Sequence, residues 1–511
     1  MSYNCDLKYY RPEWTCGRYQ EEYQAAIYYN LIEGMSYYFE DHSARIIGFI
    51  LSTSKQSFFT LAQLSDYTGI SSDILYPFLE QLHSLGIIAT KPMTPEDIKE
   101  YRRIVSCNRK ELGSVDDRTV SEKLPVALSN AEADYARRTG GITSVMLELT
   151  YRCSEKCIHC YNPGATRNEF ESSHRGEHQE MALDDYKRVI DELYQHGLIK
   201  VCLTGGDPFV RPITWEIIDY LKTKDIAFDI YTNGQMLIDM TEILASKYPR
   251  LVGVSIYSGI PEEHDYITRI KGSWDKSIKI VEELSELAVP INLKCCIMKP
   301  NVNSYYMVGD LAKQCGAVVQ YEVSVTDSID GDKCVSRYLR MSPEEYEIVL
   351  RDSDIPLYVG PEAPDFGRQM RNPYENPCGA GDNSFCITPD GYLIPCCSLH
   401  LKFGNLCKES LDAILQSETL LWWRNLKLAD YDECGKYDYC DYCNLCPGNN
   451  FSQWGTPLKA SENNCYIAKV RYDLAKRMRN DSYDPLGGRS LIEVLKSLHN
   501  PKLDIKREIS R

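Results

Sequence analysis

Three cysteines in one short loop constrain this chain more than any other feature. The segment reads Cys153-Ser-Glu-Lys-Cys157-Ile-His-Cys160 and follows an apolar, β-prone run over 145–150. Structural zinc sites and electron-transfer iron–sulfur clusters take four protein ligands. Three thiolates in one loop therefore predict an iron–sulfur cluster in which one iron stays open to a substrate or a cofactor.

Composition narrows the compartment and the partners. The 511 residues suffice for two or three domains, and a formal charge of −16 disfavours nucleic acid and anionic membranes, which require Lys/Arg surfaces. The first residues contain no apolar signal core, and no run approaches the roughly 20 apolar residues that span a bilayer. We therefore expect a cytoplasmic protein with no nucleic-acid partner and no membrane partner.

The cysteine count points to metal ligands. The chain has 21 cysteines, an odd and clustered set without a secretion signal, which indicates metal binding in a reducing compartment rather than disulfide bonds. Cys202, Cys295 and Cys296 lie inside expected strands, where a buried thiol packs like a small apolar side chain.

Residues 142–325 alternate short β-branched runs with helical periodicity. Strands are expected over 143–150, 201–204, 228–231, 252–256, 291–297 and 318–325. Amphipathic helices are expected near 182–196, 214–223, 239–247, 274–287 and 304–314. This alternation predicts an α/β fold with a parallel sheet, and six such units suit a partial (β/α)6 open barrel.

The candidate motifs follow successive expected strands. The cysteine loop comes after the first strand, Gly205-Gly206-Asp207-Pro208 after the second, and Thr232-Asn233-Gly234 after the third. Ligands of parallel β/α architectures bind at the carboxyl ends of the strands. Position along the chain therefore supports a site at this edge, independently of the motifs themselves.

A smaller α+β unit precedes the parallel sheet. Two short strands are expected over 26–31 and 36–40, then three helices near 43–52, 60–68 and 72–85. The last two helices form a helix–turn–helix pattern typical of winged-helix DNA binders. However, the second of them carries Asp73 and Glu80 and no Lys or Arg, so it lacks the cations that position a helix on phosphates. A peptide-docking unit whose edge strand accepts an added strand fits an acidic chain better.

Cysteines return after about residue 340, where the βα alternation ends. Gly391-Tyr-Leu-Ile-Pro-Cys396 predicts a tight hairpin that turns the backbone around a cluster. The tail after 479 contains one short expected helix, 491–498, and a charged end without an assigned role.

The three-cysteine loop, with His159 before its last cysteine, resembles the signature of the radical S-adenosylmethionine enzymes. The resemblance implies a [4Fe–4S] cluster on Cys153, Cys157 and Cys160, with S-adenosylmethionine chelating the fourth iron. Reductive cleavage of that cofactor would give a 5′-deoxyadenosyl radical that abstracts a hydrogen atom from the substrate.

The same resemblance implies further contacts to S-adenosylmethionine. Gly205-Gly206-Asp207 resembles the family's Gly-Gly-Glu motif, with Asp in place of Glu, so the carboxylate that meets the cofactor's ammonium has a shorter reach. Backbone carbonyls are the alternative ammonium contact. The implied cofactor-binding residues are His159, Gly205, Gly206, Asp207, Asn233, Ser255 and Lys294.

The distal cysteines resemble the SPASM accessory domain. Cys378, Gly391 and Cys396 match the first half of its pattern, whereas the later cysteine gaps occur in a different order. The resemblance implies two auxiliary [4Fe–4S] clusters; exchanged partners, or one zinc ion, are the alternatives. The implied ligands are Cys378, Cys386, Cys396 and Cys446 for one cluster, and Cys434, Cys440, Cys443 and Cys465 for the other. Cys397 and Cys407 are left unassigned.

Together these regions resemble a maturase that crosslinks or oxidises a ribosomally made precursor peptide. The resemblance implies that the N-terminal unit binds the leader of the precursor beside 36–40, and that a one-electron donor such as flavodoxin or ferredoxin supplies electrons. The expected domains are the recognition unit (1–93), a linker (94–140), the radical core (141–340), a bridging region (341–377), the SPASM domain (378–475) and a tail (476–511).

Two other functions stay open at this point. The same chemistry suits a protein residue, as in sulfatase maturation, or a tetrapyrrole-type small molecule. A more distant alternative is an iron–sulfur redox sensor that binds DNA. No general acid or base stands out, because Asp327, Asp330 and Asp332 are equally consistent with solvated loop carboxylates.

Overall fold

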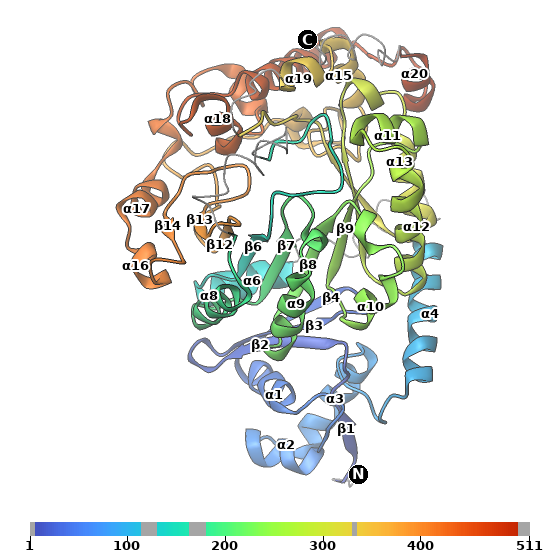
Figure 1. Ribbon diagram of the computed structural model, residues 1–511, viewed down its shortest axis with the longest axis vertical. Helices are drawn as coiled ribbons and strands as arrows, with labels where there is room; N and C mark the ends of the chain where they lie inside the picture. Colours follow the sequence, from blue (N-terminus) through green and yellow to red (C-terminus); the bar gives the residue numbers. More distant parts are fainter. Residues whose placement is uncertain (1–5, 114–129, 163–179, 330–334, 499–511) are drawn as a thin grey trace.

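A parallel sheet forms the centre of the computed structural model, which describes residues 6–113, 130–162, 180–329 and 335–498 (Figure 1). Six parallel strands pair in chain order, as an open (β/α)6 arrangement requires. They are β6 (Ser144–Glu148), β7 (Lys200–Thr204), β8 (Ala227–Thr232), β9 (Leu251–Ser255), β10 (Ile291–Cys296) and β11 (Val318–Glu322). All six predicted strands are confirmed, and the chain has an α/β fold.

Helices follow the strands and cover one face of this sheet. Side chains such as Val145, Leu203 and Ile230 alternate toward these helices and form the main apolar core with them. The opposite side of the sheet, called here the inner face, carries more polar side chains. The covering helices are α8 (Leu183–Gln195), α9 (Ile213–Thr223), α10 (Thr241–Ser246), α11 (Pro261–Thr268), α12 (Ser273–Glu286) and α13 (Tyr306–Gln314). Of these, α11 was not expected, because its eight residues are mostly polar.

The sheet continues into the cysteine-rich half. β12 (Ser384–Ile387) pairs in parallel with β6, and β13 (Tyr392–Ile394) and β14 (Gly404–Asn405) extend the sheet in antiparallel fashion. The predicted hairpin is confirmed, since Gly391 joins β12 to β13 with φ of 88°. The result is a single mixed sheet of nine strands, in which the six strands of the expected radical core continue into three strands of the expected SPASM domain.

The N-terminal unit has its own three-stranded sheet. β2 (Thr15–Gln20), β3 (Ala25–Asn30) and β4 (Met35–Glu40) are antiparallel, and β4 is an edge strand. Its helices are α1 (Asp41–Ser52), α2 (Leu61–Thr68) and α3 (Ser72–Ser84). β2 was not expected, and neither was the short antiparallel pair of β1 (Lys8–Tyr10) and β5 (Phe58–Thr60). β1 and β5 have three residues each, which is too few to show a period.

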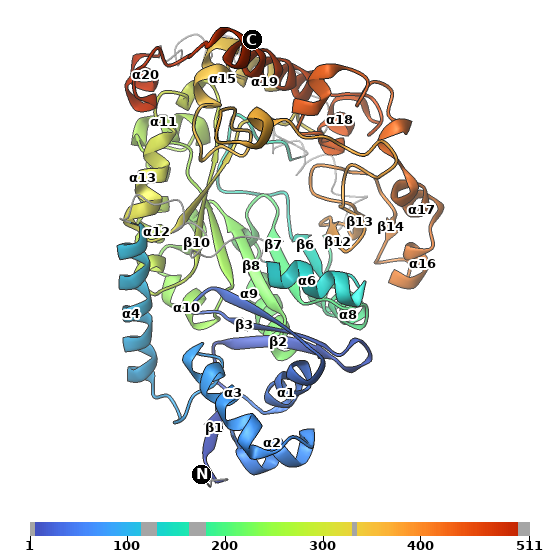
Figure 2. The ribbon, with the colours of Figure 1, turned by 180° about the vertical axis from the view of Figure 1, so that it is seen from behind.

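The N-terminal sheet packs against the amino ends of the central strands. Ile27 and Tyr29 of β3 share one apolar cluster with Ile199 and Ala227, which lie where β7 and β8 begin. The figures show this sheet beneath the central one, and helix α4 (Pro95–Gly113) alongside (Figure 2). The stretch expected as a linker thus contains α4 and α6 (Asn130–Thr139).

Short helices complete the C-terminal part. They are α14 (Val335–Leu339), α15 (Pro343–Val349), α16 (Leu411–Leu415), α17 (Glu418–Asn425), α18 (Pro447–Trp454), α19 (Glu462–Asp481) and α20 (Leu491–Ser497). α20 was predicted, and α19 runs through the expected boundary at 475. Within the described residues, no helix has the length and apolar character needed to cross a membrane.

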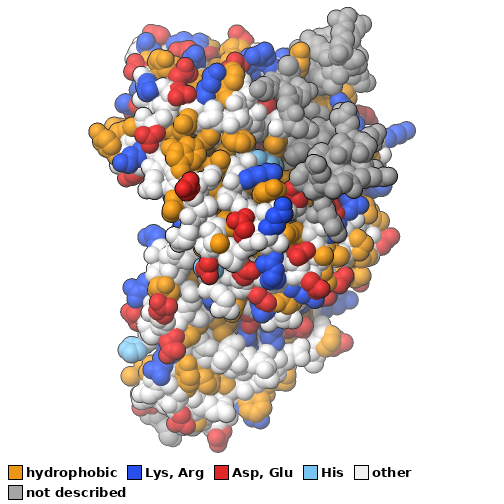
Figure 3. All heavy atoms as spheres, turned by 60° about the vertical axis from the view of Figure 1, so that its left-hand side comes forward, with side chains coloured by type: hydrophobic (Ala, Val, Ile, Leu, Met, Phe, Trp, Pro, Cys, Tyr) orange, Lys and Arg blue, Asp and Glu red, His pale blue; other side chains and the backbone are white. Residues whose placement is uncertain are grey.

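One face of the molecule shows how its charges are distributed. Lys/Arg and Asp/Glu side chains are interspersed across the described part of this face, with apolar groups gathered toward its upper left (Figure 3). Such a mixture lacks the one-sided basic field that attracts nucleic acid.

Candidate functional site

The three-cysteine loop begins where β6 ends, at the carboxyl edge of the sheet. Cys153, Cys157 and Cys160 are each partly buried. Burial, Glu155 and the neighbouring thiols at 160 and 153 raise the pKa of Cys157 well above its usual value, so the three sulfur atoms lie within electrostatic reach of one another. The Cys157 thiol donates to the Glu155 carboxylate at 3.4 Å. The loop therefore gathers the three predicted ligands in one place.

Two glycines let this loop lie directly on the next strand end. Gly205 has φ of 132°, and a Cβ there would stand 2.1 Å from the Thr150 carbonyl oxygen. A Cβ on Gly206 would stand 2.2 Å from the Arg152 carbonyl oxygen. The Gly206 N–H donates to the Thr150 carbonyl at 2.6 Å. In this structure the glycines are thus required by contact with the cysteine loop itself.

The Asp207 carboxylate is buried between the ends of β7 and β8. Its side chain is fully buried, and its carboxylate accepts hydrogen bonds from the Phe209 N–H (3.0 Å), the Thr232 hydroxyl (2.6 Å) and the Asn233 N–H (3.1 Å). Burial raises the pKa of Asp207. The carboxylate therefore ties the ends of β7 and β8 together, and its contact with the ammonium of a cofactor stays a prediction.

Asn233 lies against the cysteine loop, as a cofactor-site residue would. Its amide donates to the Cys153 sulfur at 3.3 Å and to the Ser154 hydroxyl at 3.1 Å. Its own N–H is held by Asp207, so the position of the amide follows from that buried carboxylate.

His159 packs in an aromatic stack behind the loop. Its ring meets Tyr257 edge-on at 4.6 Å, and Tyr257 stacks on His264 at 5.6 Å. Burial lowers the pKa of His159 to about 4, so the ring is neutral near pH 7, and its buried Nδ1 has no hydrogen-bond partner among the described residues. A neutral ring with one unused nitrogen suits a neighbour that the protein itself does not provide.

Ser255 and Lys294 lie on the inner face of the sheet. The Lys294 ammonium donates to Gln320 at 2.8 Å and stands 3.9 Å from the centre of the Tyr231 ring. Burial lowers the pKa of Lys294. A Cβ on Gly253 would stand 2.7 Å from the Lys294 side chain, so this glycine makes room for it. The Lys294 ammonium thus contacts an amide oxygen and an aromatic ring.

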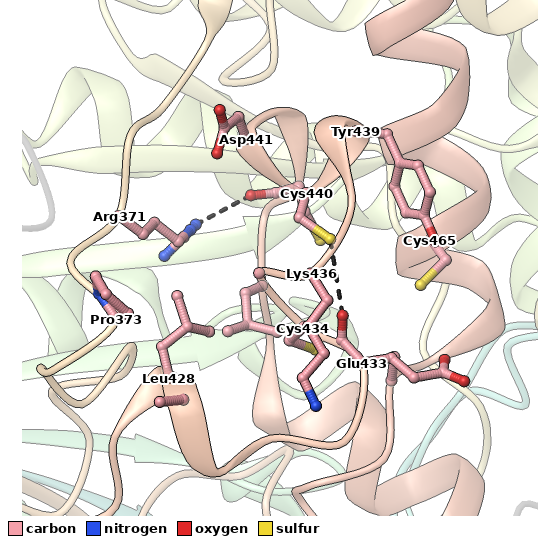
Figure 4. Close-up of a pocket in the computed structure, with 15 residues that line it drawn as sticks. Arg371, Pro373, Leu428, Glu433, Cys434, Lys436, Tyr439, Cys440, Asp441 and Cys465 are labelled. Carbon is pink, nitrogen blue, oxygen red and sulfur yellow. Dashed lines mark hydrogen bonds between the residues drawn. The ribbon is translucent and has the colours of Figure 1, made fainter.

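One set of distal cysteines surrounds a cavity. Cys434, Cys440, Cys443 and Cys465 line a space of about 430 Å³ (Figure 4). Arg371 donates to the Cys443 carbonyl at 3.0 Å and closes one side. Four thiols around an enclosed space match the donor set that a four-iron cluster takes.

The other distal set gathers where the two halves meet. Neighbouring thiols at 446 and 378 contribute to the raised pKa of Cys396, and Cys396 contributes to that of Cys386. Cys386 lies on β12, in register with Met146 of β6. The neighbouring thiols thus include Cys378, Cys386, Cys396 and Cys446, the set expected from the order of the chain, and also Cys397, which raises the pKa of both Cys386 and Cys396.

The spacing within these groups bears on the kind of metal. Within the described ranges, no three His, Cys, Asp or Glu side chains converge closely enough for a single metal ion. A mononuclear zinc site needs thiolates that all lie about 2.3 Å from one ion. Whether each distal set holds a [4Fe–4S] cluster, or one of them a zinc ion, stays a prediction.

Cys397 and Cys407, the two unassigned distal cysteines, lie in different surroundings. Cys407 is exposed, whereas Cys397 is partly buried beside Tyr161, whose pKa it raises. The sequence offered no sign of this difference, because Cys397 adjoins a predicted ligand and its surroundings come from the distant strand β6 and the loop after it.

Two segments of the chain match known protein families. Residues 147–303 match the model of the radical SAM superfamily, and residues 378–447 match that of the SPASM iron-sulfur cluster-binding domain. The first match contains the three-cysteine loop and the glycine pair. The second contains seven of the eight distal cysteines assigned above, all except Cys465.

Several curated proteins are similar over about half of this chain. The antilisterial bacteriocin subtilosin biosynthesis protein AlbA of Bacillus subtilis is 26% identical over 58% of this chain and 66% of its own length, just under two thirds. The AdoMet-dependent heme synthase of Methanosarcina barkeri is 26% identical over 59% of this chain and 89% of its own length. The mycofactocin maturase MftC of Mycobacterium tuberculosis is 26% identical over 57% and 75%.

Solved structures show only a general likeness. The crystal structure of Streptococcus suis SuiB bound to the precursor peptide SuiA is 14% identical, covers 89% of this chain and 99% of that one, and has a TM-score of 0.46. At that score the likeness adds nothing to the assignments above.

Proposed function

We propose, from the premise that this chain is a radical S-adenosylmethionine enzyme with a SPASM domain, that it modifies a ribosomally made precursor peptide. Cys153, Cys157 and Cys160 would hold the catalytic [4Fe–4S] cluster. When bound, that cluster and S-adenosylmethionine supply a 5′-deoxyadenosyl radical for hydrogen abstraction. The two distal sets would hold auxiliary clusters that accept the electron left on the substrate.

The residues around the loop would position and enclose this chemistry. Asp207 fixes the ends of β7 and β8, Asn233 donates to Cys153, and the neutral His159 ring excludes water behind the loop. Lys294 and Ser255 present a cation and a hydroxyl on the inner face, where the cofactor's carboxylate and ribose are the groups they suit. An external one-electron donor would reduce the catalytic cluster.

The observation that carries the peptide assignment is the edge strand β4. Its partner on one side is β3, and its side chains are partly exposed, which leaves an edge to which an extended peptide can add. A peptide substrate is also consistent with the likeness to AlbA, a bacteriocin biosynthesis protein, and to MftC, a maturase.

The test starts from short reading frames beside the gene. Each encoded peptide would be made synthetically and incubated with anaerobically reconstituted enzyme, S-adenosylmethionine and reductant. Mass spectrometry of the peptide and quantification of 5′-deoxyadenosine are the readouts. A mass change coupled to deoxyadenosine supports the proposal, and deoxyadenosine without any peptide change contradicts it.

A proline in β4 tests the leader site more sharply than deletion of 1–93. Deletion would uncover the apolar amino ends that Ile27 and Tyr29 cover. Backbone N–H groups alternate between the two sides of a strand, so of Tyr37→Pro and Tyr38→Pro one removes a donor from the free edge only. The better-folded variant should lose leader binding; unchanged binding by that variant would contradict a β4 site.

A small-molecule substrate is the second candidate. The heme synthase of Methanosarcina barkeri is matched over 89% of its own length, a larger share than the 66% of AlbA. Turnover of a tetrapyrrole by the reconstituted enzyme, with full activity in the β4 variant, would favour this candidate over a peptide.

A further inference from the structure

A cavity of about 270 Å³ lies between the last parallel strand and the cysteine-rich half. Tyr161, Glu322 and Ser324 line it from the core, and Cys446, Asn449 and Asn464 from the other side. Tyr161 directly follows Cys160, and Cys446 belongs to a distal cysteine set. A group held in this cavity would therefore stand between two proposed iron–sulfur sites.

The cavity carries one formal negative side chain and no described basic one. Glu322 ends β11, and its side chain is exposed although the surrounding protein raises its pKa, which is the combination expected of a group facing an internal space. Its carboxylate accepts a hydrogen bond from the Ser324 N–H at 2.7 Å. Among the described lining residues there is no Lys, Arg or His.

The opposite wall is neutral and already hydrogen-bonded. The Asn449 amide donates to the Ser324 hydroxyl at 3.1 Å and to the Asn464 carbonyl at 3.0 Å, and it accepts from Thr326 at 3.0 Å. Asn449 and Asn464 are both buried. The buried Nδ2 of Asn464 has no hydrogen-bond partner among the described residues. These groups fix the shape of the wall but supply no charge to compensate Glu322.

We propose that this cavity receives a lysine or arginine side chain of the substrate peptide, with Glu322 as its counter-ion. The word peptide rests on the function proposed above; the preference for a cation rests on the cavity alone. Glu322 is the one formally charged side chain among the described lining residues, so a cation held in the cavity is attracted to it.

Other occupants fit less well. An acidic side chain would be repelled by Glu322, and an apolar one would leave the carboxylate uncompensated. The volume is also below the roughly 300–1,000 Å³ of pockets that enclose drug-sized ligands, so one long side chain suits it better than a whole small molecule.

The test compares two tripeptides with the reconstituted, S-adenosylmethionine-loaded enzyme. N-acetyl-Gly-Lys-Gly-amide and its norleucine counterpart differ in the ammonium group, and calorimetry at low ionic strength measures their binding. The lysine peptide should bind about tenfold or more tightly than the norleucine peptide. Equal binding of the two peptides would overturn the proposal.

Two substitutions locate the effect. Glu322→Gln should abolish the preference for lysine, and Glu322→Lys should transfer it to N-acetyl-Gly-Glu-Gly-amide. The matched control is Glu216→Gln, because Glu216 is exposed on α9, outside the residues that line the cavity, and its removal should leave the preference unchanged. Circular dichroism and thermal melting check that each variant is folded. A preference retained in folded Glu322→Gln would also overturn the assignment.

This experiment is separate from the test of the function. Tripeptide binding needs neither a leader nor turnover, so a lysine preference without any modified precursor would leave the cavity assigned and refute the peptide maturase. A modified precursor together with no lysine preference would support the peptide maturase and overturn the assignment of the cavity.

Discussion

The buried polar groups at the two ends of the parallel sheet have different kinds of partners. At the amino ends, Glu132 of α6 is bonded to Lys200 at 2.5 Å and lies 3.6 Å from Arg250, which also pairs with Asp229. Tyr29 of the N-terminal sheet adds a hydrogen bond of 3.2 Å to Glu132. All four charged side chains are buried, and each has an opposite charge beside it.

At the carboxyl ends, carboxylates such as Glu148 and Asp207 are buried near thiols and neutral rings. His159 and His264 each keep one buried ring nitrogen without a partner among the described residues, and Asp207 is satisfied only by neutral donors. Paired charges hold one end together, whereas unused polar atoms at the other are typical of a ligand site. The comparison predicts that substitutions at the amino ends mainly cost stability, and that those at the carboxyl ends mainly cost activity.

The largest effect is expected for Glu132→Ala. Removing this carboxylate leaves Lys200 and Arg250 buried with less opposite charge, so the free energy of unfolding should fall by about 3–5 kcal/mol. Chemical denaturation measures it. Glu216→Gln on exposed α9 is the control and should change stability by less than about 0.5 kcal/mol. A small loss in Glu132→Ala would mean that water reaches the network.

Gly206→Ala should affect activity more than stability. The new Cβ would meet the Arg152 carbonyl at 2.2 Å and the Tyr151 carbonyl at 2.5 Å, so the cysteine loop must move. Formation of 5′-deoxyadenosine should drop by at least about 100-fold, which corresponds to roughly 2.7 kcal/mol. Gly379→Ala, where the added Cβ has nothing within 4 Å and φ is not positive, is the control for the methyl group itself. Equal activity in both variants would contradict the required contact.

Acid should weaken the carboxyl ends through His264. Burial lowers the pKa of His264 to about 4 from 6.5, so its contribution to stability is complete above about pH 6.5 and is lost as the pH falls toward 4. Between pH 7 and pH 5 the wild type should lose about 2 kcal/mol that His264→Gln does not lose. Denaturant unfolding at both pH values measures the difference, and parallel curves would contradict it.

Thr232→Val should give the smallest effect. The variant removes the hydroxyl that donates to Asp207 at 2.6 Å and leaves that buried carboxylate with two neutral donors. A loss of about 1–2 kcal/mol in stability is expected. Thr232→Ser keeps the hydroxyl and should recover most of it; an equal loss in both variants would assign the effect to packing.

Much of the carboxyl edge could be predicted from local patterns. The six strands show β-branched runs, and Cys153, Cys157 and Cys160 are marked by spacing alone. Those signals lie within a few residues of one another. The assignment of the eight distal cysteines to two clusters stays a prediction from their order.

The parts that escaped prediction depend on partners far apart in the chain. Ser384 of β12 pairs with Ser144, 240 residues earlier, and the four residues of β12 have no clear period of their own. No local pattern shows that β8 and the residue after it would supply two donors to Asp207. Glu132 and Lys200 likewise find each other only after folding.

The pairing of β12 with β6 also has a consequence for protein engineering. An accessory module that is joined only by a tether can be exchanged between enzymes by cutting the tether. Here the donor of a cysteine-rich half would have to bring an edge strand in register with Ser144–Leu147, or the recipient sheet would end at an open edge prone to association. Chimeras should therefore be spliced ahead of β12, so that the donor supplies this strand together with β13 and β14.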